Sequence, residues 1–556
     1  MKRCNSMGGR LFSLLPAALL AIGAVSCGGG ATSVNIPLSE MAPEAIRVNG
    51  ELGKRLARNF DRMETPLYQP DQVFWSEEES GGWPGDKEGR TILALTLLQR
   101  ATGRKALYLD SIMARLPKAL NEKGYLGSVF EEADEQQLSG HGWLLRGLCE
   151  YYVMTGDSAV LDIAGGIVDG LFLPLKGKLE TYPVEPSARI AGTGDMSGSL
   201  QDVSGGWRLS SDIGCLFIGM EGLIHYYTLR PSPEVKELIE SMLSLFMSLD
   251  LKAIKAQTHA SLTALRGVMR YMDFTGDRRW LPEVESRWRL YCVDGMTENF
   301  ENFNWFDRFD TWTEPCAIVD SFMLAVQLWK AIGNPAFLDM ADAIYYNGLC
   351  HTQRANGGFG CDKPVGPAFE DISVHADEAH WCCTMRGGEG LAKVAQYSYF
   401  QKGDTILIPL LRDSELTLSG KDLHLTQRSG YPFGGDVTLS ASGADADDYV
   451  VGIHIPAYMD APSFSIAGEL LSGVKEDGFL YVGARRLKEG ELKIGYEVKM
   501  DTLDSGASCH KFMMGPLMMG REVDSIGLSP LYHLMNPKVS IGNGYSKKVL
   551  FHSNDD

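Results

Sequence analysis

Two adjacent cysteines near the middle of the chain have the clearest potential for chemistry. They are Cys382 and Cys383 of His-Trp-Cys-Cys-Thr-Met, shortly before the helical pattern Gly-Leu-Ala-Lys-Val-Ala-Gln. A thiol at a helix N-terminus has a lowered pKa, and its thiolate is both a nucleophile and a metal ligand. Buried unreactive thiols and a Cys382–Cys383 disulfide are the alternatives that the residue types leave open.

A second stretch, Thr-Glu-Pro-Cys, offers two more ligands at the start of another predicted helix. Pro315 suits the first turn of a helix that runs to about residue 330, so Glu314 and Cys316 lie at its N-terminus. Three thiolates and one carboxylate can surround a zinc ion in tetrahedral geometry. We therefore predict that Glu314, Cys316, Cys382 and Cys383 bind Zn²⁺.

The segment around Glu314 is rich in both acids and aromatic rings. Its acids are Glu298, Glu301, Asp307 and Asp310, and its aromatic residues are Phe300, Phe303, Trp305, Phe306, Phe309 and Trp312. A sugar cleft needs aromatic faces for stacking, and apolar surroundings raise the pKa of a catalytic acid. We therefore predict that Trp305 and Trp312 bind substrate. The alternative is a loop with exposed acids and half-buried aromatic residues.

Two histidines occupy equivalent places in the pattern of predicted helices. His141 lies in Leu-Ser-Gly-His-Gly-Trp and His259 in Ala-Gln-Thr-His-Ala-Ser, and each opens an apolar helix. In a ring of helices such positions often point into one funnel, so we predict that both histidines contact substrate. A structural role for each ring is the alternative.

A short motif that contains a glycine recurs along the first 400 residues and indicates repeated helical hairpins. Its glycines are Gly103, Gly156, Gly276 and Gly333, with gaps of 53, 120 and 57 residues. Most follow one apolar helix and precede another, as a helix C-cap does. Segments near residues 230 and 403 fill the missing places in the series. The period predicts an (α/α)6 barrel over residues 45–405, with an open α-solenoid as the alternative.

The periodicity of polar and apolar residues changes after about residue 405. Short stretches of alternating polar and apolar residues, separated by Gly, Asp, Ser and Lys, predict a C-terminal antiparallel β-sandwich domain over residues 406–556. The fold class is thus mainly α. Long polar loops at 185–207 and 352–380 interrupt the helical part, and such loops are often functional.

The N-terminus is typical of an exported protein. A basic start, an apolar stretch and Ala-Val-Ser-Cys predict a signal peptide over residues 1–26, lipidation of Cys27, and a tether over 27–44. We therefore expect a lipoprotein of the cell envelope, in the periplasm or on the outer-membrane surface, that contacts membrane only through its lipid anchor. The formal net charge of −19 argues against a nucleic-acid partner.

Together these residues resemble glycoside hydrolase family 127, the β-L-arabinofuranosidase group, over most of the chain after the signal peptide. The features that carry the resemblance are the Glu-x-Cys at 314–316, the Cys-Cys pair at 382–383, the two histidines at hairpin starts, and the barrel followed by a β domain. Glu298 also fits, because it precedes Glu314 by sixteen residues.

The resemblance implies roles for individual residues. Cys382 would be the nucleophile and Glu298 the acid/base, while Glu314, Cys316 and Cys383 would hold zinc together with Cys382. The implied activity is a retaining exo-hydrolysis of a furanoside, such as β-L-arabinofuranose in plant-type oligosaccharides or polysaccharides.

The chain departs from the family pattern directly after the cysteine pair. The family has Pro-Pro-Asn there and an Arg three residues further on, whereas this chain has Thr384, Met385, Arg386 and then Glu389. We expect any change in substrate choice to arise at these four positions. Two other functions stay open: a glycosidase or polysaccharide lyase of the same fold that uses only carboxylates, Glu298 with Asp307 or Asp310, and a non-catalytic glycan-binding lipoprotein.

Overall fold

The structure is a computed structural model, and it describes residues 38–75, 82–189, 198–364, 366, 368, 372–498, 500–504, 510–522, 528–530 and 548–550. The predicted signal peptide and the predicted lipidated Cys27 lie outside the described residues. The lipoprotein and its location therefore stay predictions.

Six inner helices form a closed ring. They are α3 (Asp86–Thr102), α5 (Glu135–Thr155), α7 (Leu216–Leu229), α9 (Thr258–Thr275), α11 (Pro315–Ile332) and α14 (Cys383–Gln396). Each packs against the next, and α14 packs against α3. Because the ring closes, the predicted (α/α)6 barrel is confirmed and the open solenoid is wrong.

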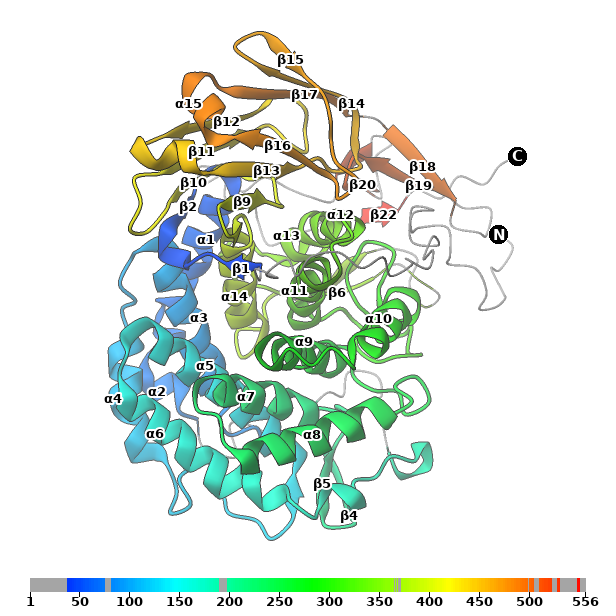
Figure 1. Cartoon of the computed structure of the whole chain (residues 1–556). Coiled ribbons are helices and arrows are strands. Elements are labelled where there is room, and N and C mark those ends of the chain that lie inside the picture. Colours follow the sequence, from blue (N-terminus) through cyan, green and yellow to red (C-terminus); the bar gives the residue numbers. More distant parts are fainter. Residues whose placement is uncertain are drawn as a thin grey trace, which may run out of the picture.

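Each inner helix has an outer partner. The outer helices are α1 (Gly50–Met63), α4 (Leu109–Ala119), α6 (Ser158–Ile167), α8 (Pro233–Ser248), α10 (Leu281–Leu290) and α12 (Ala336–Ala343). They pack on α14, α3, α5, α7, α9 and α11, respectively. Figure 1 shows the inner helices α9 and α11 near the centre and α4, α6 and α8 at the periphery.

The glycines of the recurring motif lie at helix ends, as predicted. Gly103, Gly156, Gly276 and Gly333 all adopt left-handed backbone angles, with φ between 69° and 82°, and cap α3, α5, α9 and α11. The segment near residue 230, which was predicted to belong to the same series, also joins two helices, since α7 ends at Leu229 and α8 begins at Pro233. The segment near residue 403 does not join two helices. Gly403 lies in a turn between two strands, because the chain passes from α14 directly into a sheet.

Other glycines let the inner helices approach closely. A Cβ atom on Gly222 of α7 would lie 2.2 Å from the carbonyl oxygen of Gly142 on α5. A Cβ atom on Gly89 of α3 would lie 2.2 Å from the backbone nitrogen of Leu144 on α5. Any larger residue at these positions would push the helices apart, so the small side chains set the width of the barrel.

Two larger sheets follow the barrel. One has the order β1 (Ser39–Glu40), β8 (Phe400–Lys402), β9 (Thr405–Ile408), β13 (Val450–His454), β16 (Phe479–Gly483). The other has the order β15 (Glu469–Leu471), β14 (Met459–Ile466), β17 (Leu492–Val498), β12 (Val437–Ser442), β11 (His424–Ser429), β10 (Ser414–Thr417), β2 (Ile46–Val48). Buried residues of both sheets, such as Leu439 and Val451, belong to one core. Within these two sheets, the described strands pair antiparallel except β9 and β13, which are parallel.

The described strands form three further sheets as well. The first joins β18 (Met500–Asp504), β19 (His510–Met514), β20 (Leu517–Glu522), β21 (Leu528–Pro530) and β22 (Lys548–Leu550). The others are β3 (Ala133–Asp134) with β5 (Trp207–Ser210) and β4 (Leu200–Ser204), and the pair β6 (Cys361–Lys363) and β7 (Ser373–Ala376). The last two sheets interrupt the barrel, in or beside the long loops of the sequence.

The segment before the first helix belongs to the sheets. β2 forms the edge of the seven-stranded sheet beside β10, and β1 pairs with β8. Figure 1 shows these blue strands next to the yellow strands β9 and β10, which come some 360 residues later. The sequence pattern placed these residues in the tether and at the start of the barrel, because strands this short carry little alternation. The predicted division at residue 405 stays a prediction.

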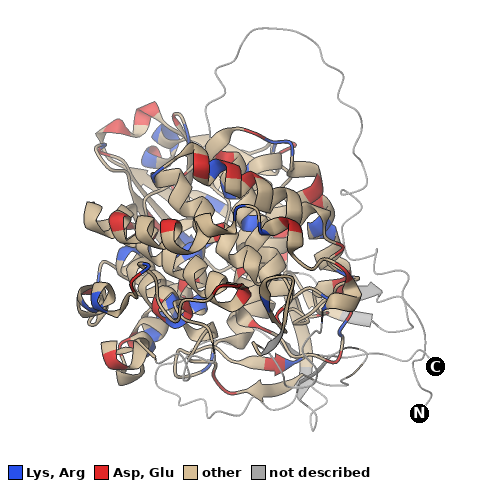
Figure 2. Ribbon diagram, turned by 90° about the horizontal axis from the view of Figure 1, so that it is seen from below, with Lys and Arg blue, Asp and Glu red and all other residues tan. Residues whose placement is uncertain are grey.

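The surface carries both signs of charge. In the view of Figure 2, acidic and basic residues are interspersed along the same helices. Two stretches, Ser158–Leu175 and Pro315–Ile332, are long and apolar enough to cross a membrane by length and composition alone. Buried helices of globular proteins meet the same test, and Pro315–Ile332 is the inner helix α11.

Candidate functional site

The N-terminal ends of the inner helices meet at a cavity of about 520 Å³. Its walls come from the starts of α3, α9, α11 and α14 and from the two long polar loops. The charged and sulfur-containing residues among its described lining are Asp86, Lys87, Glu88, Arg90, Asp212, His259, Glu314, Cys361, His375, Cys382 and Cys383. A cavity of this size suits a small-molecule ligand.

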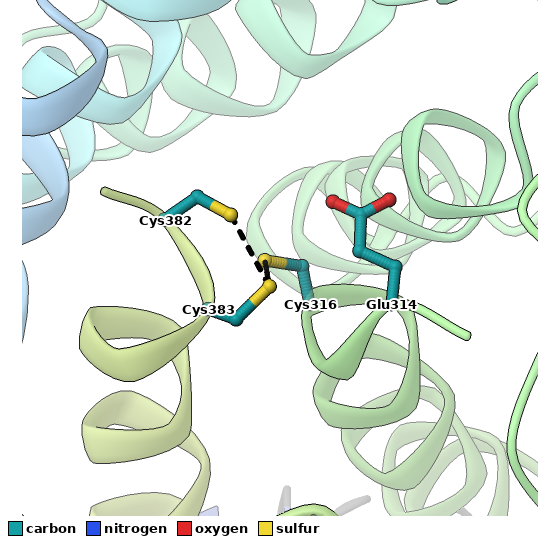
Figure 3. A group of neighbouring side chains, drawn as sticks. All are labelled: Glu314, Cys316, Cys382 and Cys383. Carbon is teal, nitrogen blue, oxygen red and sulfur yellow. Dashed lines mark hydrogen bonds between the residues drawn. The ribbon is translucent and has the colours of Figure 1, made fainter. Parts of the chain in front are cut away.

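Four predicted ligands converge on the cavity. One side-chain atom from each of Glu314, Cys316, Cys382 and Cys383 lies within 4.8 Å of the others. Figure 3 shows the first two at the start of α11 and the cysteine pair at the start of α14. All four lie at helix N-termini, as Pro315 and the helical pattern after the pair predicted. The cysteines are free, so the Cys382–Cys383 disulfide is wrong.

The donor set fits zinc. Two sulfurs bound at about 2.3 Å to a tetrahedral zinc ion lie about 3.8 Å apart. The Sγ atoms of Cys316 and Cys383 are 3.7 Å apart, and those of Cys382 and Cys383 are 3.2 Å apart. Arg90 donates from Nη1 to Sγ of Cys316 at 3.4 Å, which places a positive charge beside the thiols. That charge favours the thiolate of Cys316, although burial raises the pKa of this thiol well above its usual value.

Glu314 is held in place and ionised. Its Oε1 lies 3.2 Å from Nδ1 of His259, and its Oε2 accepts a hydrogen bond from Gln257 at 3.4 Å. Burial opposes ionisation, but the neighbouring His259 and Arg90 lower the pKa of Glu314 below its usual range. The carboxylate is therefore available as an oxygen ligand.

The three thiols differ in access. Cys316 and Cys383 are fully buried, and burial raises the pKa of both thiols well above the usual value. Cys382 is half-buried and lines the cavity. Of the three, Cys382 is thus the one that a ligand in the cavity reaches.

Comparison with known proteins confirms the expected resemblance in three dimensions. By sequence, the chain matches no protein-family model and no curated protein. By structure, it is similar to a GH127 beta-arabinofuranosidase, with a TM-score of 0.64, 15% identity, and coverage of 88% of this chain and 86% of that one. The chain has the fold of glycoside hydrolase family 127.

Two further structures agree. A structure described as a glycoside hydrolase has a TM-score of 0.66 at 14% identity, over 88% of this chain and 84% of that one. A GH127 beta-L-arabinofuranosidase from Geobacillus stearothermophilus T6 has a TM-score of 0.60 at 14% identity, over 86% of each chain. Because these matches cover at least 86% of this chain, the similarity extends over both the barrel and the β domain.

The predicted acid/base Glu298 lies in the segment before α11. It is half-buried and is not among the described residues that line it. Asp307 and Asp310 are exposed, and Asp310 pairs with Arg308 at 2.7 Å, so the carboxylate-only alternative gains no support. The lining instead includes Glu88, which lies on the first turn of α3.

Glu88 has the properties of a general acid. Its side chain is 5% exposed, and burial raises the pKa of Glu88 to about 8. Its Oε2 accepts a hydrogen bond from the backbone of Gly85 at 3.1 Å, which completes the capping of the helix. Glu88 was not among the residues predicted from the sequence. The signal was present as Trp-Pro-Gly-Asp-Lys-Glu, a turn followed by an acid on the first helical turn.

His141 has a structural role, contrary to the prediction. It is fully buried and is not among the described lining residues. Its Nε2 accepts a hydrogen bond from Leu126 N at 2.9 Å, and its Nδ1 donates to Gln137 O at 2.7 Å. Burial lowers the pKa of His141 to about 4, so the ring is neutral. His141 lies well inside α5, which begins at Glu135, whereas His259 lies in the first turn of α9 and lines the cavity.

The two predicted tryptophans also differ. Trp312 lines the cavity and stacks on His375 with ring centroids 4.7 Å apart. Trp305 is fully buried behind it, and its indole nitrogen donates to Ser211 O at 3.2 Å, so it supports Trp312 from outside the lining. The sequence analysis missed three further aromatic residues of the lining. These are Trp75, Trp83 and Trp381.

Two of the departures from the family pattern pair with buried charges below the cavity. Arg386 donates to Asp320 at 2.5 Å and also pairs with Glu389. Glu389 accepts from Arg146 at 2.5 Å and lies 3.7 Å from Arg266. All five side chains are at most 1% exposed. The charges at positions 386 and 389 therefore belong to an internal network.

The other two departures also point inward. Thr384 donates to Glu378 at 2.9 Å, and the sulfur of Met385 accepts from Thr91 at 3.0 Å. Both side chains are fully buried, and neither residue is among the described lining. The expectation that these positions set substrate choice is therefore not supported, because none of the four side chains reaches the cavity.

Proposed function

We propose that the protein is a retaining glycoside hydrolase that removes a furanose residue, such as β-L-arabinofuranose, from the end of a plant-type glycan. One observation carries the proposal. A half-buried thiol, Cys382, lies in a cavity with a tryptophan-rich lining, within 4.8 Å of the other ligand atoms of a zinc-type quartet. The similarity to structures described as GH127 arabinofuranosidases supports the choice of sugar.

The reaction follows from the chemistry of Cys382. Its thiolate attacks the anomeric carbon, the glycosidic C–O bond breaks, and the leaving oxygen takes a proton from a carboxylic acid. Water then attacks the same carbon, gives its proton to that carboxylate, and the C–S bond breaks to restore the thiolate. Two displacements at one carbon retain its configuration.

Glu314, Cys316, Cys382 and Cys383 would hold the zinc ion. When bound, zinc keeps the thiols ionised at neutral pH. The chain's own residues supply the rest: His259 orients Glu314, Arg90 places positive charge beside Cys316, and the tryptophans of the cavity exclude water from the sugar.

A carboxyl group in the cavity must protonate the leaving oxygen. The family resemblance assigns this step to Glu298, whereas the lining contains Glu88, whose raised pKa keeps it protonated near neutral pH. We therefore place the proton transfer at Glu88. Parallel measurements on Glu88→Gln and Glu298→Gln decide between the two residues.

The proposal is tested with nitrophenyl furanosides. Cys382→Ala should abolish hydrolysis, and NMR of the first product formed by the wild type should show retained anomeric configuration. An activated substrate with slow turnover should add the mass of one sugar to the wild type and none to Cys382→Ala. Cys292→Ala is the matched control, since Cys292 is a half-buried free thiol outside the described lining. Wild-type rates in Cys382→Ala would refute the mechanism.

A further inference from the structure

A second cluster of potential ligands lies outside the cavity lining. Glu301, His351 and Asp362 each place one ligand atom within 4.8 Å of the others. Their exposed fractions are 0%, 1% and 1%, respectively. None of the three has a part in the proposed hydrolysis.

Three of the four carboxylate oxygens of this cluster lack a hydrogen-bond partner among the described residues. Neither carboxylate oxygen of Glu301 has a hydrogen-bond partner among the described residues, and the same is true of Oδ2 of Asp362. Oδ1 of Asp362 accepts from Arg354 at 2.8 Å, and Nε2 of His351 lies 3.8 Å from Oδ2. A buried carboxylate without a partner costs several kcal/mol, so a proton or a cation must compensate it.

The geometry favours a cation. The unpartnered oxygens of Glu301 and Asp362 belong to the same compact group as the imidazole of His351, and carboxylate with imidazole is a donor set for divalent transition metals. We propose that Glu301, His351 and Asp362 bind a divalent transition-metal ion such as Zn²⁺ or Mn²⁺. This site is separate from the cysteine quartet and does not depend on the proposed hydrolytic activity.

The second site is linked to the first through the backbone. Cys361 and Asp362 are neighbours on β6, and Cys361 lines the cavity. Thr313, the residue before Glu314, donates its backbone N–H to Asp362 O at 2.8 Å and accepts from Asp362 N on its hydroxyl at 2.9 Å. An ion bound by Asp362 therefore fixes the segment that carries Glu314.

A shared proton is the competing explanation. Burial and the nearby Asp362 raise the pKa of Glu301 well above its usual value, although Asn299 and Arg354 act in the opposite direction. A protonated Glu301 would leave the cluster without metal. Metal stoichiometry separates the two cases.

The test is metal content of the purified full chain after equilibration with Zn²⁺ or Mn²⁺ and removal of free ions. We expect two ions per chain in the wild type, one in Cys316→Ser/Cys383→Ser, one in Glu301→Gln, and none in the triple variant. A cysteine double variant without metal, or a Glu301→Gln variant that keeps both ions, would overturn the proposal.

A matched control guards against unfolding. Asp339→Asn changes another buried carboxyl group, whose pKa burial raises to about 7, and it should keep both ions. If circular dichroism shows that Glu301→Gln does not fold, the cysteine double variant decides alone. One retained ion there supports the second site, and none excludes it.

Discussion

His259 lies between two carboxylates: its Nδ1 is 3.2 Å from Oε1 of Glu314, and its Nε2 is 3.4 Å from Oδ2 of Asp320. Its ring stacks on Trp143 with centroids 5.7 Å apart. The orientation of the imidazole is thus fixed from three sides. Partners of this kind hold a metal-binding carboxylate in place, so His259 is a positioning residue for Glu314.

Replacement of His259 should weaken metal binding at the cysteine quartet. We expect His259→Gln to lower zinc affinity about 10- to 100-fold, because Glu314 loses the group that orients it. Competition against a chromophoric chelator measures this change directly, without reference to activity.

His141→Gln is the control for this prediction. It removes another buried histidine of an inner helix, whose hydrogen bonds go to the backbone. It should lower the free energy of unfolding but leave zinc affinity unchanged. Equal loss of zinc affinity in both variants would mean that His259 acts only through general stability.

The charges at 386 and 389 should matter for stability more than for specificity. Glu389→Gln leaves Arg146 and Arg386 with one carboxylate fewer in a fully buried network. We expect the free energy of unfolding to fall by about 3–5 kcal/mol, as for one partner removed from a buried ion pair. Urea denaturation measures the loss, and the ratio of kcat/KM for two nitrophenyl furanosides should stay constant.

Glu415→Gln is the control for Glu389→Gln, because it removes one partner of an exposed ion pair instead of a buried one. Glu415 pairs with Arg428 at 2.8 Å on the surface, and both side chains are at least 41% exposed. Its loss should cost less than about 1 kcal/mol. A changed sugar preference in Glu389→Gln without loss of stability would contradict an internal role.

The sequence predicted the barrel, the β domain and the quartet because each leaves a local or periodic signal. Capping glycines such as Gly103 end helices wherever they occur, and Pro315 marks the start of one. These signals place Glu314, Cys316, Cys382 and Cys383 at helix N-termini, and closure of the ring brings the termini together.

The failures share one cause, which is that periodicity does not give the direction of a side chain. The sequence pattern put His141 and His259 at equivalent helix starts, but α5 begins earlier, at Glu135, so His141 lies well inside its helix and bonds to the backbone, whereas His259 lies in the first turn of α9 and lines the cavity. Glu298 has the expected spacing from Glu314, but spacing alone does not bring it among the described lining residues. Arg386 and Glu389 looked like changes near the nucleophile because their buried partners, such as Asp320 and Arg146, are far away in the sequence.

Hydrolysis should depend on pH through Glu88. A general acid must be protonated, and the pKa of Glu88 is raised to about 8, so kcat/KM should decline as pH rises through about 8. Glu88→Gln should lower the rate about 10²- to 10⁴-fold and remove this alkaline decline. If Glu298→Gln has this effect and Glu88→Gln does not, Glu298 is the acid.

The same group makes a prediction for stability. The folded-state pKa of Glu88 lies above its model value of 4.5, so the native state binds more protons than the unfolded state between these values. The contribution of Glu88 to stability should therefore fall as pH rises from about 4.5 to about 8. Urea denaturation across this range should show a smaller decline in Glu88→Gln, and an identical profile would contradict the raised pKa.

Trp381 should contribute to sugar binding rather than to the chemical step. It lines the cavity while 46% of it is exposed, so it is placed for a ring to stack on it. Trp381→Ala should raise KM about 2- to 12-fold with little change in kcat, since a stacking pair contributes about 0.5–1.5 kcal/mol. Phe433→Ala is the control, because Phe433 is 45% exposed and lies outside the described lining. An equal rise of KM in both variants would show that the effect does not come from the cavity, whereas a fall in kcat confined to Trp381→Ala would mean that its ring acts in the transition state.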